Sequence, residues 1–152
     1  MTETEYDDLE KRIVSLVEGE DDRISLMATV VAELFHAVDG WDWVGFYRVT
    51  APRLLKIGPY QGGHGCLSIP FDRGVCGAAA DQMKTQRVDD VDAFPGHIAC
   101  AASTRSEIVV PVTDHAGALI AVLDIDSDQP AFFSARDQEF LETLMARVFA
   151  TA

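Results

Sequence analysis

The chain has 152 residues, of which 48% are hydrophobic, and 25 acidic against 12 basic side chains give it a net charge of −13. This length favours one domain with a proper core, and the negative charge argues against nucleic acid or anionic lipid as partners. The longest apolar runs are too short to cross a bilayer. The acidic start, residues 1–8, is unlike a secretory signal. We therefore expect a cytoplasmic protein with no membrane partner.

The first 40 residues predict two helices, because apolar side chains recur there at helical spacing. Gly19 is expected to end the first helix, and Asp21 or Asp22 to cap the second. The two apolar stripes are Leu9, Ile13, Leu16 and Val17, and then Ile24, Met27, Val30, Val31, Leu34 and Phe35.

From residue 41 the pattern becomes β-like, with two strands at residues 41–49 and 53–60 joined by a turn around Pro52. A glycine-rich stretch, a short strand, a helix of small residues and an irregular segment follow, at residues 61–65, 67–69, 75–83 and 84–100.

Two further strands, residues 106–113 and 118–127, form the clearest hairpin of the sequence. The last helix opens at Ser134, with Asp137 as its capping-box partner. Helices at both ends of a mainly antiparallel sheet make the predicted fold class α+β. We expect a single domain over residues 1–152, in which two helices (1–40) precede the core (41–152).

The hairpin places acidic residues together. If its turn centres on His115 and Ala116, Glu107 lies directly opposite Asp124, and Asp126 points to the same face. Like charges that oppose each other across two strands are unfavourable. Three carboxyl groups at the end of an apolar strand therefore predict at least one raised pKa, or a bound cation.

Two alternatives stay open for these acids. A register slip of one residue, for which Pro111 could mark a bulge, would break the pairing. The carboxyl groups could also be exposed at the strand end, as most carboxylates are.

Trp43, Gly45 and Tyr47 share one face of the first strand by the period-two rule. Two aromatic rings on either side of a glycine leave an apolar slot that could hold a small ligand, such as a thioether methyl group. Aromatic side chains in such a position are more often simply part of the core.

Cys66, Cys76 and Cys100 are the only thiols of the chain. In a reducing compartment, clustered cysteines indicate redox chemistry or a metal sooner than permanent cross-links, although buried cysteines often act as small hydrophobic residues. Nine residues separate Cys66 from Cys76, which fits a structural zinc site poorly, while His97 and Cys100 have a pair-like spacing. We expect no metal and no cofactor, and the spacing leaves the connectivity of the cysteines open.

Six short segments, taken in order and with all three cysteines, resemble the free methionine-(R)-sulfoxide reductases, which are stand-alone GAF-domain enzymes. The segments are WVGFY (43–47), GPYQG (58–62), RGVCG (73–77), GHIAC (96–100), SEIV (106–109) and LDIDS (123–127). The resemblance implies a GAF fold, with the terminal helices on one side of a central antiparallel sheet, usually as a homodimer. It also implies reduction of free methionine sulfoxide, the R epimer, with thioredoxin as the final reductant.

By position, Cys100 matches the family's nucleophile, Cys66 its resolving cysteine, and Cys76 a third thiol that can take part in exchange. The aromatic wall of the family's pocket is matched by Trp43 and Tyr47, and its acidic side by Glu107, Asp124 and Asp126.

The chemistry of the reaction adds one role, because a sulfoxide oxygen has to be protonated as it leaves sulfur. We expect a protonated Glu107 to supply this proton as general acid. Two departures from the family pattern concern loop geometry: Ala101 stands in place of an expected aspartate, and residues 63–65 loosen the loop before Cys66. The competing hypothesis is a non-catalytic GAF domain that senses a small ligand or the redox state.

Overall fold

The computed structural model describes all 152 residues and is built around one six-stranded sheet, with strand order β3-β2-β1-β6-β5-β4. All neighbouring strands are antiparallel. The strands are β1 (Trp43–Ala51), β2 (Leu54–Gln61), β3 (Ser68–Pro70), β4 (Gln86–Val88), β5 (Ser106–Thr113) and β6 (Leu119–Ser127). The helices are α1 (Glu3–Leu16), α2 (Arg23–Ala37), α3 (Gly74–Gln82) and α4 (Ala135–Val148), with a 3₁₀ turn at Val91–Ala93.

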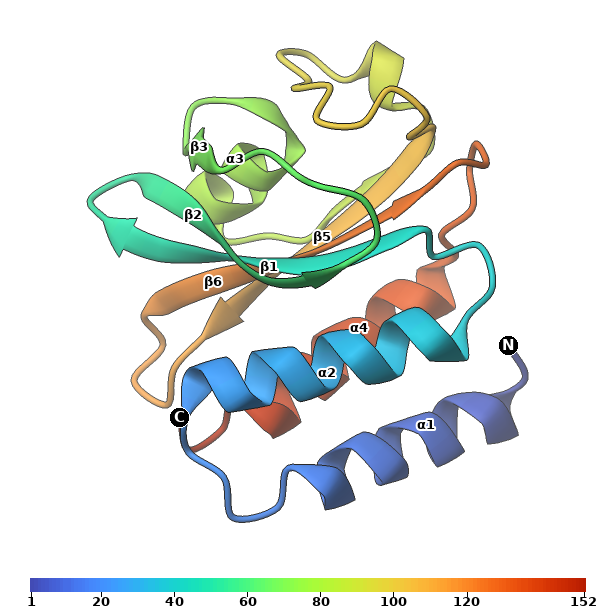
Figure 1. Cartoon of the computed structure of the whole chain (residues 1–152), viewed down its shortest axis with the longest axis vertical. Helices are drawn as coiled ribbons and strands as arrows, with labels where there is room; N and C mark the ends of the chain where they lie inside the picture. Colours follow the sequence, from blue (N-terminus) through green and yellow to red (C-terminus); the bar gives the residue numbers. More distant parts are fainter.

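The helices divide between the two faces of the sheet (Figure 1). The N- and C-terminal helices α1, α2 and α4 lie on one side, where α2 and α4 contact the strands and α1 packs outside them. Helix α3 lies on the other side. The predicted α+β class, with terminal helices on one face of an antiparallel sheet, is confirmed. None of the helices combines the length and the apolar character that a membrane crossing requires.

Alternation along β1 divides the core into two clusters. Val44 and Phe46 belong to a cluster of 25 buried residues between the sheet and the terminal helices. Trp43 and Tyr47 point the other way, into a cluster of 10 buried residues under α3. The large cluster accounts for most of the apolar burial. The small one carries the side chains that the sequence singled out for function.

The N-terminal helices form as predicted, and Asp22 caps α2 by accepting a hydrogen bond from the backbone of Ser25. Two residues of the expected stripes do not lie in the core, since Leu16 is 57% exposed and Ile24 is 48% exposed. Each stands at an end of its helix, and α1 buries Tyr6 one turn before the expected stripe begins.

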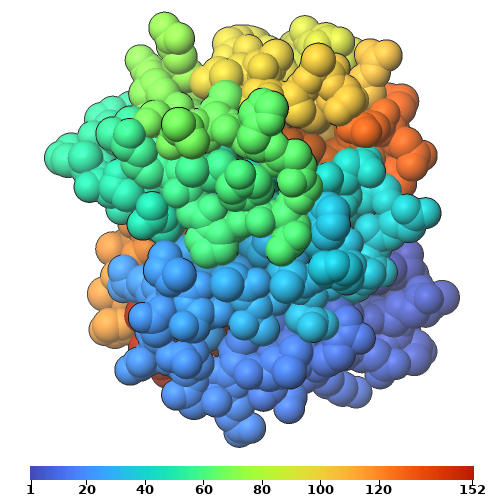
Figure 2. Space-filling view, viewed as in Figure 1, coloured from blue at the N-terminus to red at the C-terminus, as the bar shows by residue number.

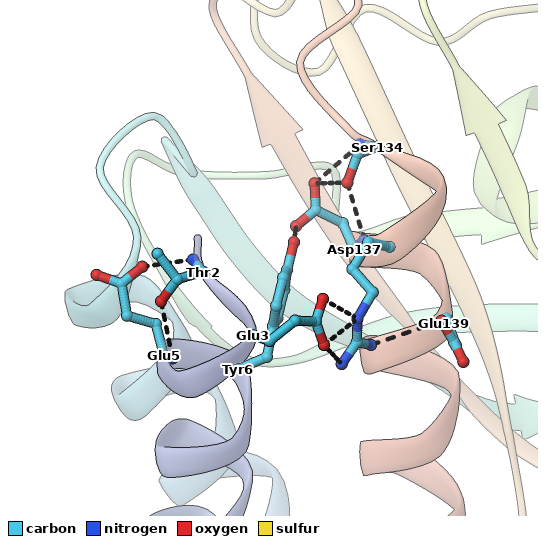
Figure 3. A network of polar contacts seen from close by, with 8 residues as sticks. Thr2, Glu3, Glu5, Tyr6, Ser134, Asp137 and Glu139 are labelled. Carbon is cyan, nitrogen blue, oxygen red and sulfur yellow. Dashed lines mark hydrogen bonds and ion pairs between the residues drawn. The ribbon is translucent and has the colours of Figure 1, made fainter.

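Helix α1 is fastened to α4 by a network of polar contacts (Figure 3). The Tyr6 hydroxyl donates to Asp137 Oδ1 at 2.7 Å, and burial together with this hydrogen bond raises the pKa of Tyr6 to about 12. Arg136 donates to both oxygens of Glu3, and its guanidinium lies 4.5 Å above the Tyr6 ring. The predicted capping box between Ser134 and Asp137 forms as well, so Asp137 serves the cap and the contact with α1 at once.

The segment expected to be irregular, residues 84–100, contains the edge strand β4 and the 3₁₀ turn. Strand β4 has only three residues, which is too few to show an alternating pattern. Its pairing with β5 is a tertiary contact that local sequence does not announce.

The β5–β6 hairpin turns through a loop that is longer than the two residues expected. The Asp114 amide donates to the Ala118 carbonyl at 2.9 Å, and the Asp114 side chain accepts from the amides of Ala116 and Ala118. A register shift follows between Val112 and Thr113, not at Pro111. The two irregularities together move the pairing by two residues from the predicted register.

As a result, Glu107 lies opposite Asp126, and Val109 lies opposite Asp124. The predicted pairing of Glu107 with Asp124 is therefore wrong. A shift of two residues preserves the face to which every side chain points, whereas a shift of one would have reversed it. Glu107, Asp124 and Asp126 thus still share the face that carries α3.

Candidate functional site

A narrow cavity of about 40 Å³ lies on the α3 side of the sheet, at the end where β1, β5 and β6 meet. Its wall includes all of the predicted site residues except Cys66, namely Trp43, Tyr47, Cys76, Cys100, Glu107, Asp124 and Asp126. Figure 2 shows the surface of the loop after β2 (green) next to that of the loop before β5 (yellow) in the upper part of the molecule.

Cys100, in the cavity wall, forms a disulfide with Cys66, and the two Cα atoms are 5.3 Å apart. Each cysteine lies in one of the two covering loops, and both are half-buried. Cys76 remains a free thiol. The fold therefore selects Cys66 as the partner of Cys100, a choice that the sequence spacing left open.

The acidic side of the cavity is built by two neighbouring strands. Glu107 on β5 is 6% exposed, Asp124 on β6 is 4% exposed, and Asp126 is half-buried. Burial, followed by the negative charge of Asp124, raises the pKa of Glu107 and that of Asp126 well above the ordinary carboxyl range. No basic side chain contributes to these shifts, so the cluster holds protons at pH values where exposed acids are ionised.

Asp124 is the member of this cluster that ionises first. Burial raises its pKa too, but hydrogen bonding from Glu107, Cys76 and Asp126 favours its charged form and limits the increase. One oxygen each of Asp124 and Asp126 (Oδ1) is buried without a hydrogen-bond partner. Such orphaned acceptors are costly unless a ligand supplies a donor, which indicates a site for a cationic or hydrogen-bond-donating group.

Cys76 reaches the acids from α3. Its Sγ lies 3.9 Å from Glu107 Oε1, and burial, followed by the charges of Asp124 and Glu107, raises the pKa of the thiol well above its ordinary value. The sulfur and one oxygen from each of these two carboxyl groups lie within 4.8 Å of one another. These are the side chains that could hold a metal ion, but the ion would have to displace the protons that burial retains there.

The aromatic side of the cavity is built on β1, as predicted. The Trp43 ring lies 5.9 Å from the Tyr47 ring with 24° between their planes. It extends over Gly45, where a Cβ atom would come within 2.6 Å of Tyr60 Cβ and would also meet the indole. Glycine at position 45 is therefore what allows the rings to close over the strand.

Sequence reasoning missed Tyr60, a third ring of this group. It lies 5.4 Å from the Trp43 ring, 19° from parallel, and is paired with Gly45 across β1 and β2. The signal was present in the hairpin of residues 41–60, because strand pairing brings Tyr60 beside position 45. Alternation along β1 alone does not reveal this cross-strand neighbour.

The covering loop before Cys66 is packed more tightly than its glycines suggest. The Trp43 indole N–H donates to the Gly63 carbonyl at 2.7 Å. A Cβ atom at Gly65 would lie 2.9 Å from both the indole and the Tyr47 hydroxyl, whereas one at Gly63 would meet nothing within 4 Å. His64 lines the cavity beside Gly65, and Ala101 lines it from the other loop.

Comparison with known proteins gives this geometry a context. The family model described as GAF domain matches residues 20–148. Free methionine-R-sulfoxide reductase of Escherichia coli is 39% identical over 149 residues, which cover 97% of this chain and 89% of that protein.

Solved structures agree with the sequence comparison. The X-ray structure of free methionine-R-sulfoxide reductase from Neisseria meningitidis in complex with its substrate has a TM-score of 0.90 at 41% identity, covering 97% of this chain and 89% of the other. The structure of fRMsr of Staphylococcus aureus in its reduced form has a TM-score of 0.90 at 40% identity, covering 95% and 92%. With the cysteines, acids and aromatic rings gathered around one cavity, the chain belongs to the free methionine-R-sulfoxide reductase family of GAF-domain proteins.

Proposed function

We propose that the protein reduces free L-methionine-(R)-sulfoxide to methionine by thiol chemistry. The observation that carries the proposal is that Cys100, in a disulfide with Cys66, lines the same cavity as Glu107, Asp124 and Asp126. A sulfur nucleophile, a protonated acid and an apolar wall are the parts that reduction of a small sulfoxide requires.

In the first step the Cys100 thiolate attacks the sulfoxide sulfur while Glu107 protonates the oxygen. The raised pKa of Glu107 supports this role, because burial favours the protonated form of the carboxyl group that a general acid needs. The net reaction converts the Cys100 thiol and the sulfoxide into a sulfenic acid and a thioether. The oxygen is transferred to Cys100, so the cysteine sulfur is oxidised and the substrate sulfur is reduced. Methionine then leaves.

In the second step the Cys66 thiol attacks the Cys100 sulfenic acid, which gives the disulfide and one molecule of water. Thioredoxin then returns two electrons and two protons by thiol–disulfide exchange. Cys76 is buried and has a raised pKa, so it offers little thiolate and would take part in exchange only secondarily, after the first disulfide has formed.

Substrate recognition would divide between the two walls. Ionised Asp124, with the unpartnered oxygen of Asp126, would accept hydrogen bonds from the substrate ammonium group. Trp43 and Tyr47 would contact the S-methyl group and so select the R epimer. A peptide-bound methionine sulfoxide lacks the ammonium group, which would explain a preference for the free amino acid.

We also propose that the protein works as a homodimer in the cytoplasm and needs no cofactor. The family supports the dimer, and a cycle that begins with reduced thiols requires a compartment where thiols stay reduced.

The test is an NADPH-linked thioredoxin assay with racemic free methionine sulfoxide. We expect consumption to stop near half of the substrate, since only one epimer reacts, and N-acetylmethionine sulfoxide to be a poor substrate. Cys100→Ser should give no methionine. Full multiple-turnover activity in Cys100→Ser would refute the nucleophile assignment, and tight ligand binding without any turnover in the native chain would favour a sensor.

A further inference from the structure

The loop between β2 and Cys66 lies against side chains of β1, and Trp43 contacts it at three successive points. Trp43 Nε1 donates to the Gly63 carbonyl at 2.7 Å. On either side of this bond the loop backbone lies against the indole, since a Cβ atom would be 2.8 Å from Trp43 Cδ1 at Gly62 and 2.9 Å from its Cζ2 at Gly65. Glycine-rich backbone is entropically costly to order, and the indole, with the Tyr47 hydroxyl at Gly65, supplies contacts that order it.

Beyond the cysteine, the chain is fixed by strand pairing. The Ile57 amide donates to the Leu67 carbonyl at 3.1 Å, and β3 begins at the next residue. Cys66 is therefore held from two directions, by β2 after it and by the indole before it. The contact on the N-terminal side of Cys66 depends on the position of the Trp43 indole.

The indole stacks on Tyr60 as well as on Tyr47. The Trp43 and Tyr60 rings lie 5.4 Å apart and nearly parallel, and Gly45 allows both to approach over β1. Tyr60 is 38% exposed and does not line the cavity, so its ring has no contact with a ligand there. It sits at the end of β2 next to the loop it would control.

We propose that Tyr60 is a positioning residue for Cys66. By stacking on Trp43 it holds the indole N–H against the Gly63 carbonyl, and the ordered loop then keeps the Cys66 thiol within bonding reach of Cys100. The inference deepens the proposed function, because it concerns the disulfide on which the second step rests. It assigns Trp43 a task beyond contact with substrate.

The pairing of two thiols depends on their effective concentration, which falls when either loop becomes mobile. A disulfide requires Cα atoms about 4.4–6.8 Å apart, and the observed 5.3 Å meets this condition with the loop in place. Loss of the Tyr60 ring should leave Cys66 exploring a larger volume, so that the disulfide forms less favourably.

The experiment measures this equilibrium without any sulfoxide. The protein is equilibrated with mixtures of reduced and oxidised glutathione, in which protein dithiol and oxidised glutathione give protein disulfide and two reduced glutathiones. Acid quenching, alkylation and mass spectrometry then give the fraction of the Cys66–Cys100 disulfide. Failure of the sulfoxide assay would not affect this measurement. The role of Tyr60 and the proposed reductase activity are therefore tested independently.

For Tyr60→Ala we expect the equilibrium constant for disulfide formation to fall about three- to tenfold, as for the loss of one aromatic pair. Tyr60→Phe keeps the ring and should match the native protein. Trp43→Phe keeps a ring but lacks the indole N–H, and should also lower the constant. Tyr6→Phe, on the opposite face of the sheet, controls for a general loss of stability and should leave the constant unchanged. An unchanged constant in Tyr60→Ala, or an equal fall in Tyr6→Phe, would overturn the proposal.

Discussion

Glu107 on β5 lies directly opposite Asp126 on β6, and both carboxyl groups belong to the same buried cavity. With Asp124 beside them, three acids share this cavity, which Arg73 also lines. Because burial raises their pKa values, the cluster ties the stability of the fold to its state of protonation.

The first prediction concerns this dependence of stability on pH. The folded chain retains protons on Glu107 and Asp126 that the unfolded chain releases above a pH of about 4, so the free energy of unfolding should fall as pH rises through their raised pKa values. Glu107→Gln keeps a hydrogen-bond donor but cannot ionise, and should be more stable than the native chain at pH 8, with the difference vanishing toward pH 4. Urea unfolding from pH 4 to pH 8 measures it.

Glu18→Gln, at an exposed position, is the control for the loss of one negative charge. A Glu107→Gln protein that is less stable than the native chain at pH 8 would contradict the assignment of a protonated Glu107.

The second prediction concerns the reactivity of the three thiols in the reduced protein. Cys76 is 4% exposed and its pKa is raised by burial, so little thiolate is available there. Iodoacetamide should modify Cys66 and Cys100, in the two surface loops, well before Cys76. Mass spectrometry over time gives the three rates, and in urea they should converge. Early modification of Cys76 in the folded protein would show that the thiol is accessible.

The third prediction separates the two chemical steps. Cys66→Ser should release one methionine per chain and stop at the Cys100 sulfenic acid, which dimedone traps in a form that mass spectrometry identifies. Cys100→Ser should release none and trap none. Sustained turnover of Cys66→Ser with thioredoxin would mean that another thiol resolves the intermediate just as well.

The fourth prediction tests the space over β1. Gly45→Ala places a Cβ atom against Tyr60 and the Trp43 ring, and should cost about 1–3 kcal/mol of stability by overpacking. Gly63→Ala, in the loop, meets nothing within 4 Å and should change the free energy of unfolding by less than about 0.5 kcal/mol. Urea unfolding compares the two, and equal effects would show that the close approach at Gly45 is not limiting.

The fifth prediction concerns the contact between α1 and α4. Tyr6→Phe removes the buried hydrogen bond to Asp137 and leaves an acceptor without its donor, which should cost about 1–3 kcal/mol. Arg12→Gln breaks the exposed ion pair with Glu33 and should cost much less, since such pairs contribute little. Denaturant unfolding measures both. Similar losses would show that the Tyr6 bond contributes no more than a surface contact.

Features that depend on neighbouring residues could be read from the sequence. The cap at Asp22 and the capping box of Ser134 and Asp137 form as predicted because each satisfies amides within one turn of its own helix. Alternation along β1 and β6 predicted which side chains share a face of the sheet. The acids and the aromatic rings could therefore be grouped from the sequence.

Features that depend on the exact form of a turn, or on contacts between distant residues, could not be read from the sequence. The register of β5 and β6 was missed by two residues because the Asp114 side chain builds a longer turn. The partner of Cys100 is set by the meeting of two loops, and Tyr60 acts on Trp43 across a strand pair. The contact between Cys66 and Cys100 joins residues whose separation in the chain carries no signal, whereas Tyr60 could be placed only through the pairing of β1 with β2.

The order of the strands bears on how the chain matures during synthesis. Strand β1 is flanked by β2 on one side and by β6 on the other, so its second neighbour leaves the ribosome only after all three cysteines have done so. Until then Cys66, Cys76 and Cys100 lack the sheet that sorts them into a bonded pair and a buried thiol. A nascent chain that ends before β6 carries every thiol of the site but neither Asp124 nor Asp126.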